Sequence, residues 1–205
     1  MTTLLQINAS IQGENGQSSQ LANGFVTAWQ ARHPQGRVLR RDLAADPVPH
    51  LTAARFGAFL APPEQRTPEQ HGIAQFSDAL IEELRQAELL VIGLPMYNFG
   101  VPSQLKAYFD HIARAGHTFR YTAQGPIGLL TGKKAYVFAA RGGLYQGTSL
   151  DTQTQYVRDF LRFLGIVDVQ FVYAEGLAID AERRESALGA ARTQIAQLME
   201  DRAAA

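Results

Sequence analysis

The sequence predicts one α/β domain over residues 1–205, built on a doubly wound, five-stranded parallel sheet with helices on both faces. Short apolar runs of strand length alternate regularly with segments of helical periodicity. The run Leu89–Leu94 is apolar throughout, which is typical of a central parallel strand covered on both sides. A length of 205 residues with 46% hydrophobic content suffices for one compact core and leaves little room for a second.

The strands are expected where short apolar runs stop at polar or glycine-rich loops. They are Thr3–Asn8, a strand through Val38 and Leu39 that ends near Asp42, Leu89–Leu94, Lys134–Ala140 and Val167–Ala174. Crossovers between parallel strands are right-handed in nearly all proteins. Ligands of such sheets bind beyond the C-terminal strand ends, so the loops at those ends are the candidate site.

The helices are expected between these strands, where apolar residues recur at three- and four-residue spacing. Their buried faces are expected at Leu21, Phe25, Ala28 and Trp29; Ile73, Phe76, Leu80 and Leu84; Leu105, Tyr108, Phe109 and Ile112; Tyr156, Phe160 and Leu164; and Leu188, Ile195 and Leu198. Pro102 suits a first helical turn, where its missing N–H needs no acceptor. The proline-rich segment 46–68 is expected to be irregular, with a short helix at Ala53–Leu60.

Composition excludes several classes of function. Lysine plus arginine and aspartate plus glutamate each total 19, so no strong field favours nucleic acid or an anionic membrane. The absence of cysteine excludes disulfides, thiolate metal sites and thiol redox chemistry. The five histidines show no metal-ligand spacing, so we expect surface or loop histidines and no metal. No apolar run reaches the length of a membrane span or secretory signal, which favours the cytoplasm.

The first candidate loop, residues 8–19, is rich in hydroxyls and amides and leads directly into a helix. Ser10, Gln17 and Ser18 lie where free backbone N–H groups and the helix dipole favour an anion, which suits a phosphate group. The loop lacks the GxGxxG and P-loop patterns of dinucleotide and ATP sites. Alternatively, Ser18 serves only as a helix N-cap.

The second and third loops suit a flat ring. Met96, Tyr97, Asn98 and Phe99 offer a thioether, two aromatic rings and an amide between prolines, although a locally packed aromatic corner would look the same. The stretch 139–145 contains two adjacent glycines, which let backbone N–H groups approach a ligand but also occur in simple turns. Because the topology brings all three loops to one sheet edge, together they predict an FMN site.

Five segments of the sequence resemble a known family: PMYNF at 95–99, RAGHTFRY at 114–121, GPIGLLTGKK at 125–134, RGG at 141–143 and AEG at 174–176. The chain is similar nearly end to end to the FMN-dependent NADH azoreductases, which belong with the flavodoxin-like quinone reductases. The resemblance implies a flavodoxin-like fold, a homodimer with FMN at the interface, NADH or NADPH as donor, and quinones and azo compounds as acceptors.

The resemblance also assigns roles to individual positions. Phe119, Tyr121 and Phe163 are candidates for stacking on substrate from the partner subunit, and Tyr145, which stands where such enzymes also have histidine, is a further candidate for substrate binding. Gly16 and Ala140 stand where the family often has serine, so we expect weaker flavin binding at worst. The implied cofactor-binding residues are Ser10, Gly16, Gln17, Ser18, Met96, Tyr97, Asn98, Phe99, Ala140, Arg141, Gly142 and Gly143.

In the expected mechanism, flavin carries the chemistry and no side chain acts as a nucleophile or other catalytic group. Nicotinamide and acceptor would use one pocket in turn, which predicts ping-pong kinetics. Two other functions remain open at this stage: a flavodoxin-type carrier of single electrons, and a domain that senses flavin or quinone without turnover. The balanced charge argues against the carrier, because such proteins usually present a strongly acidic face to their partners.

Overall fold

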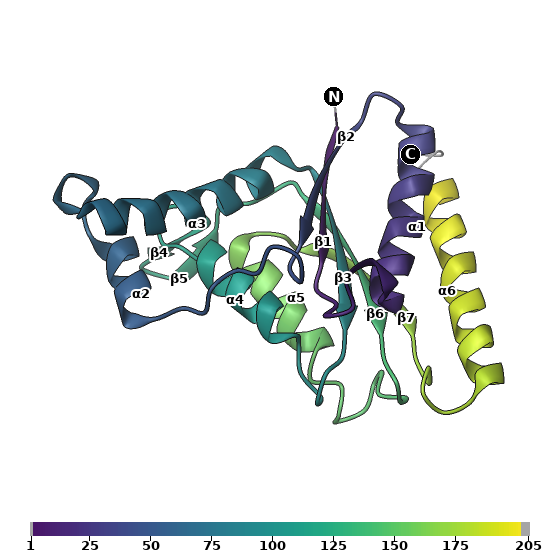
Figure 1. Ribbon diagram of the computed structural model, residues 1–205. Coiled ribbons are helices and arrows are strands. Elements are labelled where there is room, and N and C mark those ends of the chain that lie inside the picture. The colour runs from purple at the N-terminus through teal and green to yellow at the C-terminus, as the bar shows by residue number, and fades with distance from the viewer. Residues whose placement is uncertain (1, 202–205) are drawn as a thin grey trace.

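The computed structural model describes residues 2–201, and its central feature is the expected parallel sheet (Figure 1). The strand order is β2-β1-β3-β6-β7, and every neighbouring pair is parallel. The strands are β1 (Thr3–Asn8), β2 (Arg37–Asp42), β3 (Leu89–Pro95), β6 (Lys134–Ala140) and β7 (Asp168–Ala174). The flavodoxin-like fold class is therefore confirmed, with strand boundaries within one residue of those expected for four strands.

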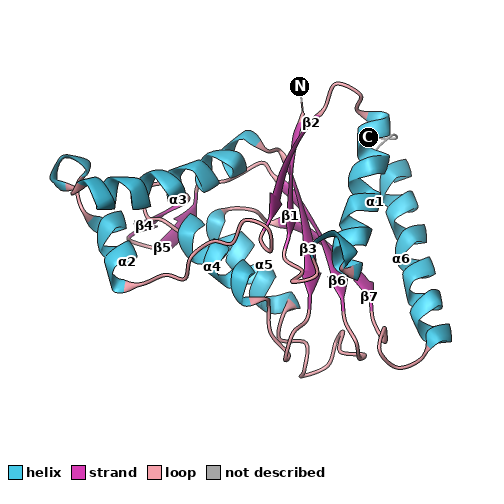
Figure 2. Cartoon of the chain, in the orientation of Figure 1, coloured by secondary structure: helices cyan, strands magenta, loops and turns pink. Residues whose placement is uncertain are grey.

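Helices cover both faces of the sheet, as Figures 1 and 2 show. The helices α1 (Gln17–Arg32) and α6 (Ala181–Asp201) lie side by side on one face. The other face carries α3 (Pro68–Gln86), α4 (Ser103–Ile112) and α5 (Thr154–Leu164). The strand period of two explains the division, because Leu89 and Val91 of β3 pack toward α1 and α6 whereas Leu90 and Ile92 pack toward the other three.

Local sequence signals explain several helix ends. Thr67 begins α3 with a capping box, in which its hydroxyl accepts from Gln70 N and the Gln70 side chain accepts from Thr67 N. The short helix α2 (Ala53–Leu60) spans the expected residues and is capped by Thr52. Gly165 ends α5 with a φ of 102°, a left-handed conformation that favours glycine.

A small antiparallel sheet was not expected from the sequence. It consists of β4 (Phe119–Thr122) and β5 (Gly125–Gly128) and lies beside α2 and α3, away from the C-terminal ends of the main strands (Figure 1). Both strands have only four residues, which is too short to show an apolar alternation, and β5 contains glycine and proline. Short 3-10 helices occur at Gly13–Asn15 and Pro63–Gln65.

His111 also departs from expectation. Its side chain is buried in α4 rather than exposed, and its ring packs edge-on against Phe59 and Phe76. The Nδ1 atom lies 2.9 Å from Ala107 O, while Nε2 has no partner among the described residues. Burial is the main cause that lowers the pKa of His111.

The carboxyl ends of the strands meet at one edge of the sheet. Pro95 of β3 pairs with Ala140 of β6, which pairs with Ala174 of β7, while Asn8 of β1 lies opposite Gly93. The loops that follow these strands therefore gather at the lower edge of Figure 1, together with the first turns of α1 and α6. Within residues 2–201, no helix has both the length and the apolarity needed to cross a bilayer.

Candidate functional site

A pocket of about 360 Å³ opens at this edge of the sheet. It is bounded by the loops after β1, β3, β6 and β7 and by the first turns of α1 and α6. The structure thus brings the three predicted loops together. The residues that line the pocket are Ser10, Gln12, Gly16, Gln17, Ser18, Pro95, Met96, Tyr97, Ala140, Arg141, Gly142, Leu177, Ala178 and Arg184.

The first turn of α1 forms one end of the pocket. Gly16 is the N-cap residue and no side chain caps the helix, so the alternative role of Ser18 as N-cap is wrong. The Ser18 hydroxyl lies inside the first turn, fully buried and without a partner among the described residues. Free N–H groups, an unpaired hydroxyl and the absence of acidic residues in this turn fit a phosphate dianion.

Gly16 lies close to the side chain of Ser10, which would have to shift if position 16 carried a side chain. A Cβ at position 16 would lie 2.1 Å from Ser10 Oγ and 2.5 Å from Ser10 Cβ. Ser10 Oγ accepts a hydrogen bond from Gln12 N at 3.2 Å and lies 3.3 Å from Tyr97 Oη. Tyr97 Oη also accepts from Ile11 N at 3.2 Å, so this tyrosine ties the first loop to the second.

The second loop turns sharply at Asn98 and Phe99. Both residues have positive φ, 49° and 62°, and the turn is closed by hydrogen bonds between the backbones of Tyr97 and Gly100. Left-handed backbone is unfavourable for a bulky residue such as phenylalanine. Phe99 is half exposed, and its ring lies edge-on to that of Tyr145 with centroids 5.6 Å apart. The packed aromatic corner is therefore present, and of the predicted residues in this loop Met96 and Tyr97 line the pocket whereas Asn98 and Phe99 do not.

The third loop presents backbone donors. The carbonyls of Arg141, Gly142 and Gly143 accept hydrogen bonds from residues 177, 178 and 176, which fixes the loop against the end of β7. The N–H groups of Gly142 and Gly143 have no acceptor within the described part of the chain. A side chain at position 142 would crowd Ala178, with Cβ atoms 3.2 Å apart. These two donors fit the polar edge of a flavin ring.

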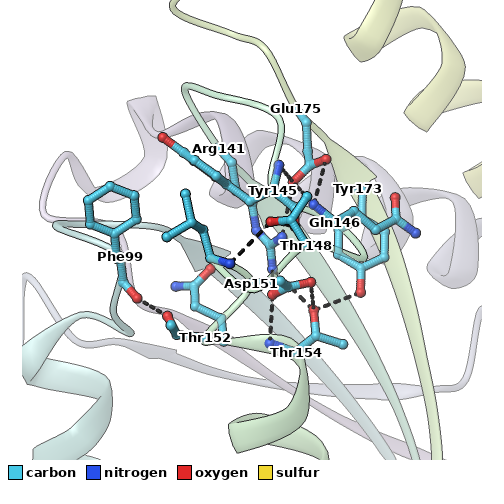
Figure 3. A network of polar contacts seen from close by, with 12 residues as sticks. Phe99, Arg141, Tyr145, Gln146, Thr148, Asp151, Thr152, Thr154, Tyr173 and Glu175 are labelled. Atoms are coloured by element: carbon cyan, nitrogen blue, oxygen red, sulfur yellow. Dashed lines mark hydrogen bonds and ion pairs between the residues drawn. The ribbon is translucent and has the colours of Figure 1, made fainter.

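Arg141 lies beneath this loop with its guanidinium turned into the protein (Figure 3). Its side chain is fully buried and donates to Glu175 Oε1 at 3.0 Å and Asp151 Oδ1 at 2.8 Å. Burial alone would raise the pKa of Asp151, but hydrogen bonds from Arg141 and Thr154 outweigh it and the pKa is lowered. Glu175 in turn accepts from the backbone N–H groups of Tyr145 and Gln146.

Comparison with known proteins decides the family. The family described as "Flavodoxin-like fold" matches residues 2–199. An FMN-dependent NADH:quinone oxidoreductase of Cellvibrio japonicus is 53% identical over 197 residues, 96% of this chain and 98% of the relative. Another, from Burkholderia thailandensis, is 55% identical over 196 residues, 96% of this chain and 99% of the relative. The chain belongs to the family of FMN-dependent NADH:quinone oxidoreductases.

Solved structures are similar to this family member over almost the whole chain. An azoreductase from Bacillus anthracis strain Sterne has a TM-score of 0.90 at 26% identity and covers 98% of this chain and 100% of its own. An FMN-dependent NADH-azoreductase from Bacillus anthracis Ames Ancestor, crystallised with FMN, has a TM-score of 0.86 at 27% identity, with coverage of 97% and 100%.

The predicted substrate residues of this oxidoreductase family member lie in two places. Tyr145 lies on the third loop and packs against Phe99, and its side chain does not line the pocket. Phe119 is buried against Phe163, with ring centroids 4.3 Å apart, while Tyr121 stands exposed on β4. None of Phe119, Tyr121 and Phe163 lines the strand-edge pocket of the same chain, so they could contact its ligand only from a second copy.

Sequence reasoning missed the contributions of β7, α6 and the start of α5. Leu177, Ala178 and Arg184 line the pocket because β7 ends at the same sheet edge as the three loops that were considered. The exposed Arg184 guanidinium has no ion pair recorded among residues 2–201. The sequence did contain a signal for this part of the pocket, since the segment AEG at 174–176 lies at the end of a predicted strand. No group of three or more histidine, aspartate or glutamate side chains in the described residues is placed to hold a metal.

Proposed function

We propose that this chain binds FMN in the strand-edge pocket and uses it to pass two electrons from NADH to quinones and aromatic azo compounds. One observation carries the proposal: the pocket combines an unpaired buried hydroxyl at a helix N-terminus with the free N–H donor of Gly142 on the opposite loop, next to the free N–H of Gly143. This pairing suits a ligand with a phosphate at one end and a polar ring edge at the other. The names of the similar proteins support the same cofactor, donor and acceptors.

The residues around the pocket would hold FMN in distinct ways. Ser10, Gly16, Gln17 and Ser18 would bind the phosphate, and the exposed Arg184 would add a positive charge. When bound at these residues, FMN would supply the redox chemistry that links hydride donation by the nicotinamide to reduction of the acceptor.

The ring would be held by the other two loops. Met96, Tyr97, Asn98 and Phe99 would line the flavin on one side. Ala140, Gly142 and Gly143 would face it on the other, with N–H groups preorganised to stabilise negative charge on the ring. Donor and acceptor would use this pocket in turn, which predicts ping-pong kinetics.

A homodimer is the second part of the proposal. The helix α2 and the β4–β5 hairpin expose a group of apolar side chains around a hollow of about 190 Å³. Tyr121, which is 74% exposed, would reach the ligand of the partner together with Phe119 and Phe163. Isolated exposed apolar residues are ordinary, but a contiguous group of this kind marks an interaction surface. The group comprises Phe56, Leu60 and Tyr121, which all line the hollow.

Sedimentation velocity tests the dimer. Tyr121→Glu should shift the protein toward the monomer and raise the KM for quinone, because a buried charge opposes association. Val167→Glu is the matched control, since Val167 is 73% exposed and precedes β7, on another part of the molecule. A Tyr121→Glu protein that sediments like wild type would contradict the proposed interface.

A single absorbance experiment tests the activity. The protein is mixed with FMN and filtered, then treated anaerobically with NADH and afterwards with benzoquinone. We expect flavin to remain with the protein, to bleach with NADH and to recover with quinone. Flavin that passes the filter would refute the proposal, and bound flavin that NADH cannot bleach would favour the carrier or sensor.

The lack of cysteine and the use of NADH fit a cytoplasmic location.

A further inference from the structure

The segment 151–154, at the N-terminal end of α5, lies between the two loops proposed to hold the flavin ring (Figure 3). On one side it contacts the turn 95–100. The buried amide of Gln153 donates from Nε2 to Pro95 O at 2.9 Å and to Gly100 O at 2.8 Å. Thr152 Oγ1 donates to Phe99 O. All three acceptors are backbone carbonyls, so the segment binds the turn at its first residue, Pro95, and at its last two, Phe99 and Gly100.

On the other side the same segment holds Arg141. Asp151 Oδ1 accepts from Arg141 Nη2, and Thr154 Oγ1 accepts from the same nitrogen at 3.1 Å. Thr154 Oγ1 also lies 2.8 Å from both Asp151 Oδ2 and Tyr173 Oη. Arg141 also donates to Glu175, whose carboxylate accepts hydrogen bonds from the backbone N–H groups of residues 145 and 146. A continuous network therefore links the two loops through residues 151–154.

The turn needs such support because its backbone is strained. Asn98 and Phe99 both adopt left-handed φ angles, which persist in a folded protein only where surrounding contacts impose them. The backbone hydrogen bonds between Tyr97 and Gly100 do not use the carbonyls of Pro95 and Phe99. Gln153 donates to the Pro95 carbonyl and Thr152 donates to the Phe99 carbonyl. Neither residue lines the pocket, so both would act on a ligand only through the turn.

We propose that residues 151–154 are a clasp that sets the spacing of the turn 95–100 and the loop 141–146, with Thr152 and Gln153 as positioning residues for the flavin ring. The inference rests on the proposed function. Because the clasp acts at the ring end, its loss should weaken FMN and riboflavin equally. Loss of a phosphate contact, in contrast, should weaken FMN alone.

Two substitutions with matched controls test the clasp. Gln153→Met keeps the side-chain volume and removes both donors, while Gln155→Met makes the same change two residues along, at an exposed amide bound to Asp159. Thr152→Val removes the hydroxyl from an exposed position where misfolding is not expected, whereas Thr152→Ser keeps a hydroxyl at that position. Affinities for FMN and riboflavin are measured by flavin fluorescence, with kcat and KM for NADH and quinone. Hydrogen exchange of residues 96–100 is followed in the flavin-free proteins.

We expect Gln153→Met to lower both flavin affinities by about tenfold and Thr152→Val by roughly two- to fivefold, since each net hydrogen bond contributes a factor of about two to ten. Exchange at 96–100 should accelerate in both variants, while Gln155→Met and Thr152→Ser match wild type. Unchanged exchange and affinity in Thr152→Val and Gln153→Met would overturn the clasp, as would an equal loss in Gln155→Met. Failure of the wild type to bind FMN would refute the proposed function, whereas the exchange measurement would still decide the clasp.

Discussion

Replacing Arg141 by methionine tests the buried ion network most directly. The guanidinium is fully buried and contacts two carboxylates that are themselves only 8% and 12% exposed. Methionine keeps much of the volume but leaves Asp151 and Glu175 without their cation. Removing one partner of a buried ion pair destabilises a protein by about 3–5 kcal/mol, because the remaining charge is buried without compensation. Such a loss is a large part of the roughly 5–15 kcal/mol that stabilises a typical domain.

Urea unfolding at neutral pH, followed by circular dichroism, measures this effect. Arg162→Met is the matched control, because Arg162 is 65% exposed and pairs with Asp159 only on the surface of α5. Exposed pairs of this kind contribute about 0–1 kcal/mol. The slope of free energy against urea should stay the same in all three proteins, so that a shift in midpoint reports stability. A loss below about 1 kcal/mol for Arg141→Met would refute the argument.

The pH dependence gives a second check. The pKa of Asp151 is lower in the folded protein than its ordinary value, so this carboxylate stabilises the fold above about pH 4 and loses that contribution as the pH falls through its folded pKa. Without Arg141, burial would instead raise the pKa of Asp151. The difference in stability between wild type and Arg141→Met should therefore shrink on acidification, and a difference that stays constant to pH 3 would contradict the assignment.

Three further predictions concern single side chains. Ser18→Ala should lower FMN affinity by up to about tenfold without destabilising the flavin-free protein, because the Ser18 hydroxyl has no partner there. The control Ser19→Ala removes another buried, unpaired hydroxyl that does not line the pocket, and it should bind FMN like wild type. Arg184→Gln should weaken FMN by roughly two- to tenfold and leave riboflavin unchanged, and an equal loss for both flavins in titrations would exclude a phosphate contact. His111 has a lowered pKa in the fold, so wild-type stability should fall as the pH drops below about 6.5, by at most about 1.4 kcal/mol per unit. His111→Gln should lack that part of the slope in urea titrations at pH 7.5 and 5.5, and identical slopes would show that His111 does not titrate on unfolding.

The architecture was predictable because it depends on local patterns. The unbroken apolar run at 89–94 identified the central strand, and the helical spacing of Leu105, Tyr108, Phe109 and Ile112 identified the buried face of α4. Parallel strands with helical connections leave few topologies, so the meeting of the three loops followed from chain order alone. Most residues that line the pocket were accordingly found in those loops.

Tertiary structure alone decided how individual polar side chains are used. An arginine at a strand end looks the same in sequence whether it faces a ligand or turns inward, and only the positions of Asp151 and Glu175 direct Arg141 inward. The same holds for Gln153, whose two acceptors lie more than 50 residues away. By itself, the sequence determined the parallel α/β fold, the sheet edge that holds the site and the three loops that form it, because apolar periodicity is a local property. The clasp, the buried His111 and the contribution of α6 were decided only by the tertiary structure, because they depend on which distant groups fill the remaining space around each side chain.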